Sequence, residues 1–176
     1  MKVFHTRCFV IVLPLLIVSC SLQNEPAQPE NHADHASVPY KDLLGKAVTD
    51  KVVTNFLAAD HCTSAAAFEL CEDLGVALYI NLHQLVETVY FYLNNVSGFS
   101  PYNGELPFGL KFYDTMGAVE YKLKRQGIGR VGLPDHAESP DHFHYNVTYQ
   151  QAHLTIVYNS PAEDEDASIY AILISQ

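Results

Sequence analysis

Basic residues are scarce in this chain of 176 residues. Lysine and arginine together number 10 against 20 aspartates and glutamates, so the formal net charge is −10 at pH 7. The basic residues are also scattered, whereas affinity for nucleic acid depends mainly on clustered lysine and arginine. The composition therefore predicts no binding of nucleic acid or phosphate groups, and the acidic charge favours association with a basic protein partner.

The chain also lacks the short motifs that mark common enzyme sites. It contains no G-x-S-x-G, no H-E-x-x-H, no phosphate-binding glycine loop and no dinucleotide fingerprint. Four consecutive acids occupy residues 163–166, but without alternating oxygen ligands and a turn glycine they indicate a solvated loop rather than a calcium site. We therefore expect a protein without enzymatic activity and without a cofactor.

The apolar run at residues 9–18 is too short for a permanent membrane span. It follows Lys2 and Arg7, as in a secretory signal. The run ends in I-V-S-C at residues 17–20, which resembles the bacterial lipobox and implies a signal peptide 1–20 with a lipid, including palmitate, on Cys20. Because Ser21 follows rather than an aspartate, we expect retention in the outer membrane, facing the periplasm. The alternative is an ordinary cleaved signal and a soluble secreted protein.

Residues 21–39 are polar and interrupted by prolines, with little to bury. Such a composition stays disordered, so we expect a tether between the lipid and a globular domain at 40–176. Flexible-chain scaling sets its reach on the order of 25 Å. We interpret His32 and His35 in this segment as solvated residues rather than metal ligands.

Four cysteines are present, and two of them lie in the N-terminal segment. Cys8 lies in the signal segment and Cys20 is the predicted lipid acceptor, which leaves Cys62 and Cys71. In an oxidising compartment this pair predicts a disulfide bond. A zinc site that adds His61 is disfavoured because it lacks a C-x-x-C pair.

The globular part contains a weak internal repeat of a helix followed by antiparallel strands. Thr49 and Thr115, 66 residues apart, each precede apolar residues at helical spacing, as helix N-caps do. The predicted first repeat covers residues 41–97, a linker covers 98–107, and the second repeat covers 108–176. The fold class expected is α+β, one domain whose helices pack on one face of a sheet.

Alternation assigns the faces of the first predicted hairpin, which turns near residues 83–84. Core positions are Val76, Leu78 and Ile80, paired with Val89, Phe91 and Leu93. The opposite face carries Tyr79, Tyr90 and Tyr92. Tyrosine is favoured at interfaces, so these three residues are candidates for binding a protein partner. The alternative explanation is the ordinary β-propensity of tyrosine.

The second predicted hairpin turns at residues 150–151, and a final strand covers 168–174. Its core positions are Phe143, Tyr145 and Val147, paired with Leu154, Ile156 and Tyr158. His142 and His144 then fall on the opposite face, on the side of Asn146, His153 and Thr155. Two histidines hold a metal only with a third ligand from elsewhere, such as His136 or Asp141. We expect a polar surface strip, with partner binding and metal binding as the alternatives.

The pattern L-P-F-G-L-K-F-Y-D-T-M-G-A-V-E-Y-K-L at residues 106–123 is similar to the SmpA/OmlA family of small outer-membrane lipoproteins, which assist β-barrel assembly. The doubled arrangement resembles the β-lactamase inhibitor protein family, in which an aromatic-rich concave sheet grips an enzyme. A short disulfide between helix and first strand in that family matches Cys62 and Cys71. These resemblances imply a lipid-anchored envelope protein that binds a protein partner, as an inhibitor or immunity-type protein. The alternative is an accessory factor in outer-membrane assembly.

Overall fold

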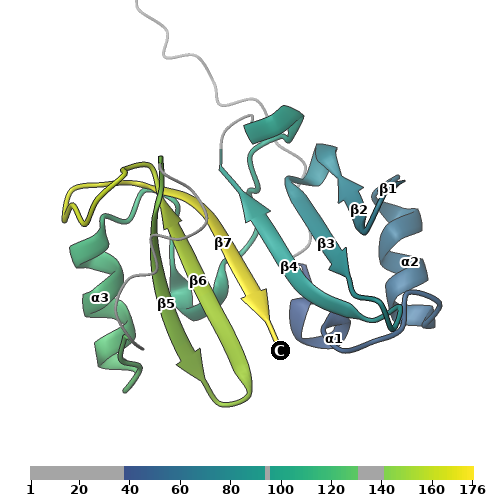
Figure 1. Ribbon diagram of the computed structural model, residues 1–176, viewed down its shortest axis with the longest axis horizontal. Coiled ribbons are helices and arrows are strands. Elements are labelled where there is room, and N and C mark those ends of the chain that lie inside the picture. Colours follow the sequence, from purple (N-terminus) through teal and green to yellow (C-terminus); the bar gives the residue numbers. More distant parts are fainter. Residues whose placement is uncertain (1–37, 94–95, 131–140) are drawn as a thin grey trace, which may run out of the picture. The chain divides into compact units, whose positions relative to one another are not determined.

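The computed structural model describes residues 38–93, 96–130 and 141–176 (Figure 1). The predicted signal segment, Cys20, His136 and the tether up to residue 37 lie outside the described residues. Val38, at the end of the predicted tether, is only 2% exposed, and its backbone N–H donates to the Tyr102 hydroxyl at 3.2 Å. The packed part of the chain therefore begins at least two residues before the expected boundary at Tyr40.

Seven antiparallel strands form one sheet, in the order β1-β2-β3-β4-β7-β6-β5 (Figure 1). The strands are β1 Thr63–Ala65, β2 Phe68–Cys71, β3 Val76–Ile80, β4 Val86–Tyr92, β5 Phe143–Tyr149, β6 Ala152–Tyr158 and β7 Ile169–Ser175. Strand β7, yellow in Figure 1, lies between β6 and β4, so the last strand of the chain joins the two hairpins into one sheet.

In the described ranges of the chain, three α-helices and three short 3-10 helices accompany the sheet. They are α1 Tyr40–Leu43, α2 Lys51–Ala59, α3 Met116–Arg125, η1 Glu72–Leu74, η2 Val96–Gly98 and η3 Pro107–Gly109. In Figure 1, α2 lies beside the half of the sheet formed by β1–β3, and α3 lies beside the half containing β5 and β6. Within the described residues, no helix combines the length and the apolar character that crossing a bilayer requires.

One of the two predicted helix caps is confirmed and the other is wrong. The Thr115 hydroxyl accepts a hydrogen bond from the Ala118 N–H at 3.4 Å and caps α3. Helix α2 is capped by Asp50, one residue after the expected Thr49, through a hydrogen bond from the Val52 N–H at 2.9 Å. Aspartate is at least as good a cap as threonine, and Asp50 stands next to the first helical residue.

The helices pack on one face of the sheet, which we define as the inner face. Val53 of α2 and both Val119 and Leu123 of α3 belong to the buried core. The strand residues in the same core include Val76, Leu78, Val89, Phe91, Phe143, Tyr145, Val147, Leu154, Ile156, Tyr158, Ile172 and Ile174. The predicted pairs Phe143–Tyr158, Tyr145–Ile156 and Val147–Leu154 are all present. The chain is thus a mixed α/β protein with a seven-stranded antiparallel sheet and few helices.

The segment predicted as a linker at 98–107 is packed around the end of β4. Phe99 is buried, and its ring lies 4.5 Å from that of Tyr92. Tyr102 is also buried, 4.8 Å from Phe91, and its backbone N–H donates to the Tyr92 carbonyl at 3.0 Å. Because successive residues of β4 point to opposite faces, the linker supplies one ring to each face of the sheet.

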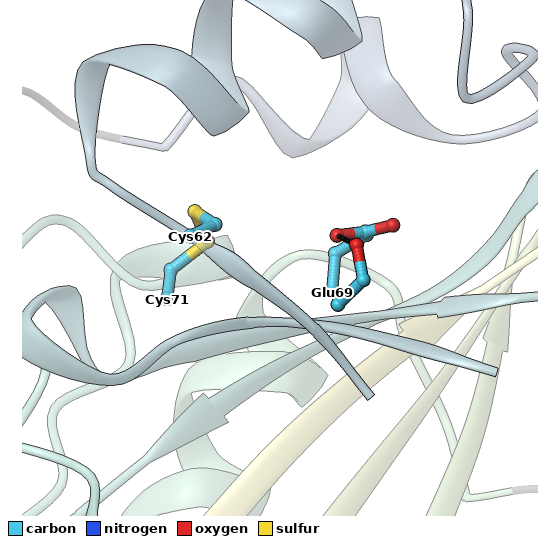
Figure 2. The surroundings of a disulfide bond; sticks show 4 residues. Cys62, Glu69 and Cys71 are labelled. Atoms are coloured by element: carbon cyan, nitrogen blue, oxygen red, sulfur yellow. Dashed lines mark hydrogen bonds between the residues drawn. A yellow bond between two sulfur atoms is a disulfide. The ribbon is translucent and has the colours of Figure 1, made fainter. Parts of the chain in front are cut away.

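The predicted disulfide between Cys62 and Cys71 is confirmed (Figure 2). It joins the chain just after α2 to the last residue of β2, and Cys71 is fully buried. Beside it, the Ser64 hydroxyl donates to the Glu69 carboxylate at 2.7 Å and links β1 to β2. The bridge therefore fastens the edge of the sheet to the helix that covers it.

Candidate functional site: the outer face of the sheet

The face of the sheet opposite α2 and α3, which we define as the outer face, has no charged side chain at its paired positions. Strand pairing assigns to it Phe68, Leu70, Ala77, Tyr79, Thr88, Tyr90, Tyr92, His144, Asn146, Thr148, His153, Thr155, Val157, Ala171, Leu173 and Ser175. None of these residues is Asp, Glu, Lys or Arg, although the chain contains 30 such residues, 10 basic and 20 acidic. The charge of this molecule is therefore concentrated elsewhere.

A continuous line of aromatic rings crosses one half of the outer face. The ring of Tyr79 lies 5.3 Å from that of Phe68, which lies 5.8 Å from Tyr90. Tyr90 stacks on Tyr92 at 6.1 Å, and Tyr92 lies 4.5 Å from Phe99. We define these five residues as the aromatic row. Centroid distances of 4.5–7 Å are those of favourable aromatic pairs, so each ring of the row packs favourably against its neighbour.

The register predicted for Tyr79, Tyr90 and Tyr92 is confirmed, because all three lie on the outer face. Their rings are half-buried, since neighbouring rings and the linker cover their sides. The sequence interpretation missed Phe68 and Phe99. Phe68 begins a strand of only four residues, too short for alternation to identify, and Phe99 lies in a loop.

The hydroxyl group of Tyr92 remains protonated at physiological pH. Burial, and secondarily the neighbouring Tyr90 and Tyr170, raise the pKa of Tyr92 to about 12. A neutral phenol both donates and accepts hydrogen bonds. At Tyr92 the aromatic row therefore presents an apolar ring with a neutral polar tip rather than negative charge.

His142 and His144 lie at the opposite side of the sheet, around the edge strand β5. His144 pairs with Val157 on the outer face. His142 precedes β5, and its ring lies 4.2 Å from that of Tyr170. The nearby His153 pairs with Thr148, and its Nδ1 lies 3.1 Å from the threonine hydroxyl. This half of the face is polar, as the sequence predicted.

The described part of the chain does not bring a third metal ligand to these histidines. Within residues 38–93, 96–130 and 141–176, no group of three or more His, Cys, Asp or Glu side chains is placed to hold a metal ion. Of the third ligands considered from sequence, His136 lies outside the described residues, and Asp141 forms no such group with the histidines. This geometry therefore favours His142 and His144 as part of a polar surface rather than as metal ligands.

An uncharged face with an aromatic half and a polar half is suited to contact with another macromolecule. Protein interfaces are depleted of charge at their centre and enriched in tyrosine and phenylalanine, with polar groups at the rim. Comparison of the chain with known proteins found no matching family model, no matching curated protein and no matching solved structure. The functional assignment therefore depends on the residues and geometry of this chain.

Proposed function

We propose that this chain is a lipid-anchored cell-envelope protein that binds another protein through its outer face, as an inhibitor or immunity-type protein. The observation that carries this proposal is the aromatic row on a face with no charged side chain at its paired positions. Half-buried rings that already pack against one another lose little conformational freedom on binding. A partner that covers them therefore gains apolar burial at a low entropic cost.

The proposed location follows from the N-terminal sequence. The I-V-S-C stretch at residues 17–20 resembles a lipobox, so we assign the lipid to Cys20 and the protein to the outer membrane, facing the periplasm. The polar segment 21–37 then acts as the tether. The Cys62–Cys71 disulfide supports export, because disulfides persist in oxidising compartments.

The proposal includes two related halves, as in the β-lactamase inhibitor protein family that the sequence resembles. Helix α2 is followed by β1, β2, β3 and β4, and helix α3 is followed by β5, β6 and β7, with the final strands β4 and β7 paired at the centre of the sheet. The fully buried Val53 and Val119 are 66 residues apart. The starts of β4 and β7, Val86 and Ile169, are 83 residues apart, so a repeat requires longer connections in the second half.

The binding proposal is tested by affinity capture from envelope extracts, followed by mass spectrometry and titration of the captured partner. Tyr79→Ala and Tyr92→Ala remove rings from the aromatic row. Tyr113→Ala is the matched control, because Tyr113 is 80% exposed outside the outer face. Truncating a buried interface aromatic commonly costs 2 kcal/mol or more, so at least one row variant should bind about thirtyfold more weakly. The control should bind normally.

The identity of the captured partner separates the two proposed roles. A lysozyme-like or toxin-like enzyme supports an inhibitor or immunity-type protein. Components of the β-barrel assembly machinery support the alternative, an accessory factor in outer-membrane assembly. Equal binding by Tyr79→Ala, Tyr92→Ala and Tyr113→Ala would show that the aromatic row is not the interface.

A further inference from the structure

A cavity of about 550 Å³ opens on the side of the sheet opposite the aromatic row. Its floor includes Leu154 and Ile174, which pair across β6 and β7 on the inner face, together with Leu44 after α1. In Figure 1 the end of β7, marked C, lies beside α1, and Gln176 lines the cavity together with residues of α1. The volume falls in the range of sites that bind small molecules.

Aromatic and polar side chains share the walls of the cavity. Tyr40, Phe108 and Tyr149 contribute rings, with Phe108 and Tyr149 edge to face at 5.2 Å, and the neighbouring Gln150 and Gln151 contribute amides. Lys41 is the one charged side chain among the lining residues that the structure describes, and its Nζ lies 5.8 Å from the Tyr40 ring. The exposed ammonium group of Lys41 can attract an anion to the cavity.

Phe108 occupies its place in the wall with a strained backbone. Its φ and ψ angles are 60° and 18°, in the left-handed region that bulky residues avoid. The side chain is half-buried and packs against the edge of the core. Left-handed bulky residues persist where the surrounding structure enforces them, and they cluster at functional sites.

Helix α3 enforces this backbone conformation. The Gln126 side-chain amide donates to the Phe108 carbonyl at 3.0 Å, and the Lys122 ammonium donates to the Gly109 carbonyl at 3.1 Å. Lys122 is itself held by the buried Asp114 carboxylate at 2.6 Å. Lys122 of α3 and Gln126, the residue after the helix, thus hold a strained turn that projects a ring into the cavity wall.

We propose that this cavity binds a small aromatic monoanion. Its flat body lies on Leu154 and Ile174 between the rings of the walls, and its acidic group meets Lys41. This site is separate from the proposed protein-binding surface, because Leu154 and Ile174 face the inner side of the sheet and the aromatic row faces the outer side.

The test uses 2-naphthoate as the probe and naphthalene-2-carboxamide as its neutral counterpart. Both are titrated into the full chain carrying Cys20→Ala, which removes the need for detergent, and binding is followed by naphthyl fluorescence. Naphthoate should bind saturably and about fivefold more tightly than the amide, the effect of a partly exposed ion pair. Lys41→Gln should remove this preference, and Lys46→Gln, an equal charge change at an exposed residue outside the cavity lining, should keep it.

The variant Phe108→Gly tests whether the Phe108 ring contacts a ligand or only packs against its neighbours. Glycine adopts the left-handed conformation without strain, which offsets part of the packing lost with the half-buried ring, so this variant should still unfold cooperatively. Its affinity for both probes should fall about tenfold, because one wall of the cavity is lost. Tyr92→Ala, on the outer face, should bind both probes normally, which distinguishes the cavity from the aromatic row.

Several results would overturn the proposal. One is the absence of saturable naphthoate binding at millimolar concentration, and another is equal affinity of Lys41→Gln and Lys46→Gln for naphthoate. Equal affinity of the wild-type chain for both probes would show an apolar site without anion preference. Loss of naphthoate binding in Tyr92→Ala but not in Phe108→Gly would show that naphthoate binds to the outer face and not in the cavity.

Discussion

Neighbouring residues of β4 have opposite roles, because a strand alternates its side chains between faces. Phe91 is fully buried in the core, whereas Tyr90 and Tyr92 lie on the outer face. Phe91→Ala should lower the free energy of unfolding by about 3–5 kcal/mol through the cavity it leaves. Tyr79→Ala, which removes a half-buried ring near the edge of the sheet, should lower it by about 1 kcal/mol. Denaturant unfolding of the two variants checks the difference, and equal losses would contradict the assigned faces.

Tyr158 carries a buried hydroxyl that finds no hydrogen-bond partner among the described residues. A buried polar group without a partner lowers stability. Tyr158→Phe removes the hydroxyl and keeps the ring, so it should raise the free energy of unfolding by about 1 kcal/mol.

The matched control for this substitution is Tyr145→Phe. The Tyr145 hydroxyl interacts with the nearby Glu120 carboxylate, so removing it should lower the free energy of unfolding instead. Urea unfolding midpoints measure both variants. A loss of stability in Tyr158→Phe would show that its hydroxyl is satisfied in solution.

Tyr92 makes the fold sensitive to alkaline pH. Its pKa is about 12 in the folded chain, against the ordinary value of 10.0, so between these values the unfolded chain loses this proton and the folded chain keeps it. The contribution of Tyr92 to stability is therefore complete below about pH 10 and is lost as the pH rises toward 12. Denaturant unfolding across this window should show a shallower loss for Tyr92→Phe than for the wild-type chain. Identical pH profiles would contradict the assignment.

At the scale of elements, the disulfide ties the chain after α2 to β2, the strand next to the edge strand β1. Reduction should lower the free energy of unfolding by roughly 2–3 kcal/mol, as the chain-entropy relation gives for so short a loop. Cys62 and Cys71 should resist alkylation until a reductant is added, which mass spectrometry of freshly isolated protein checks. Free thiols at both positions before reduction would contradict the bridge.

Elements that carry a strong local pattern were predictable. Helix α3 was recognised from Thr115 and the apolar spacing behind it, and both long hairpins were recognised from alternation. The start of α2 was displaced by one residue because Thr49 and Asp50 are both good caps. Strands β1 and β2 were missed because three or four residues do not establish a period.

At the scale of the whole molecule, the proposed lipid on Cys20 would determine where the two proposed surfaces operate. Cys20→Ala should abolish labelling by a fatty-acid analogue, and the exported variant should be soluble. Cys8→Ala, in the proposed signal segment, should leave both labelling and membrane association unchanged. Gel fluorescence after fractionation measures both variants. Labelling that persists in Cys20→Ala would rule out this anchor.

The sequence by itself determined the mixed α/β class, the faces of the two long hairpins and the Cys62–Cys71 pair. These properties follow from periodicity and composition, which are local to a segment. Only the tertiary structure placed β7 between β6 and β4, and only it brought Phe68 between Tyr79 and Tyr90 and Phe99 against Tyr92. The tertiary structure also forms the cavity behind the sheet, because it brings Lys41, Phe108 and Ile174 together from distant parts of the chain. Contacts between distant segments depend on strand order and loop paths, and no local period encodes those.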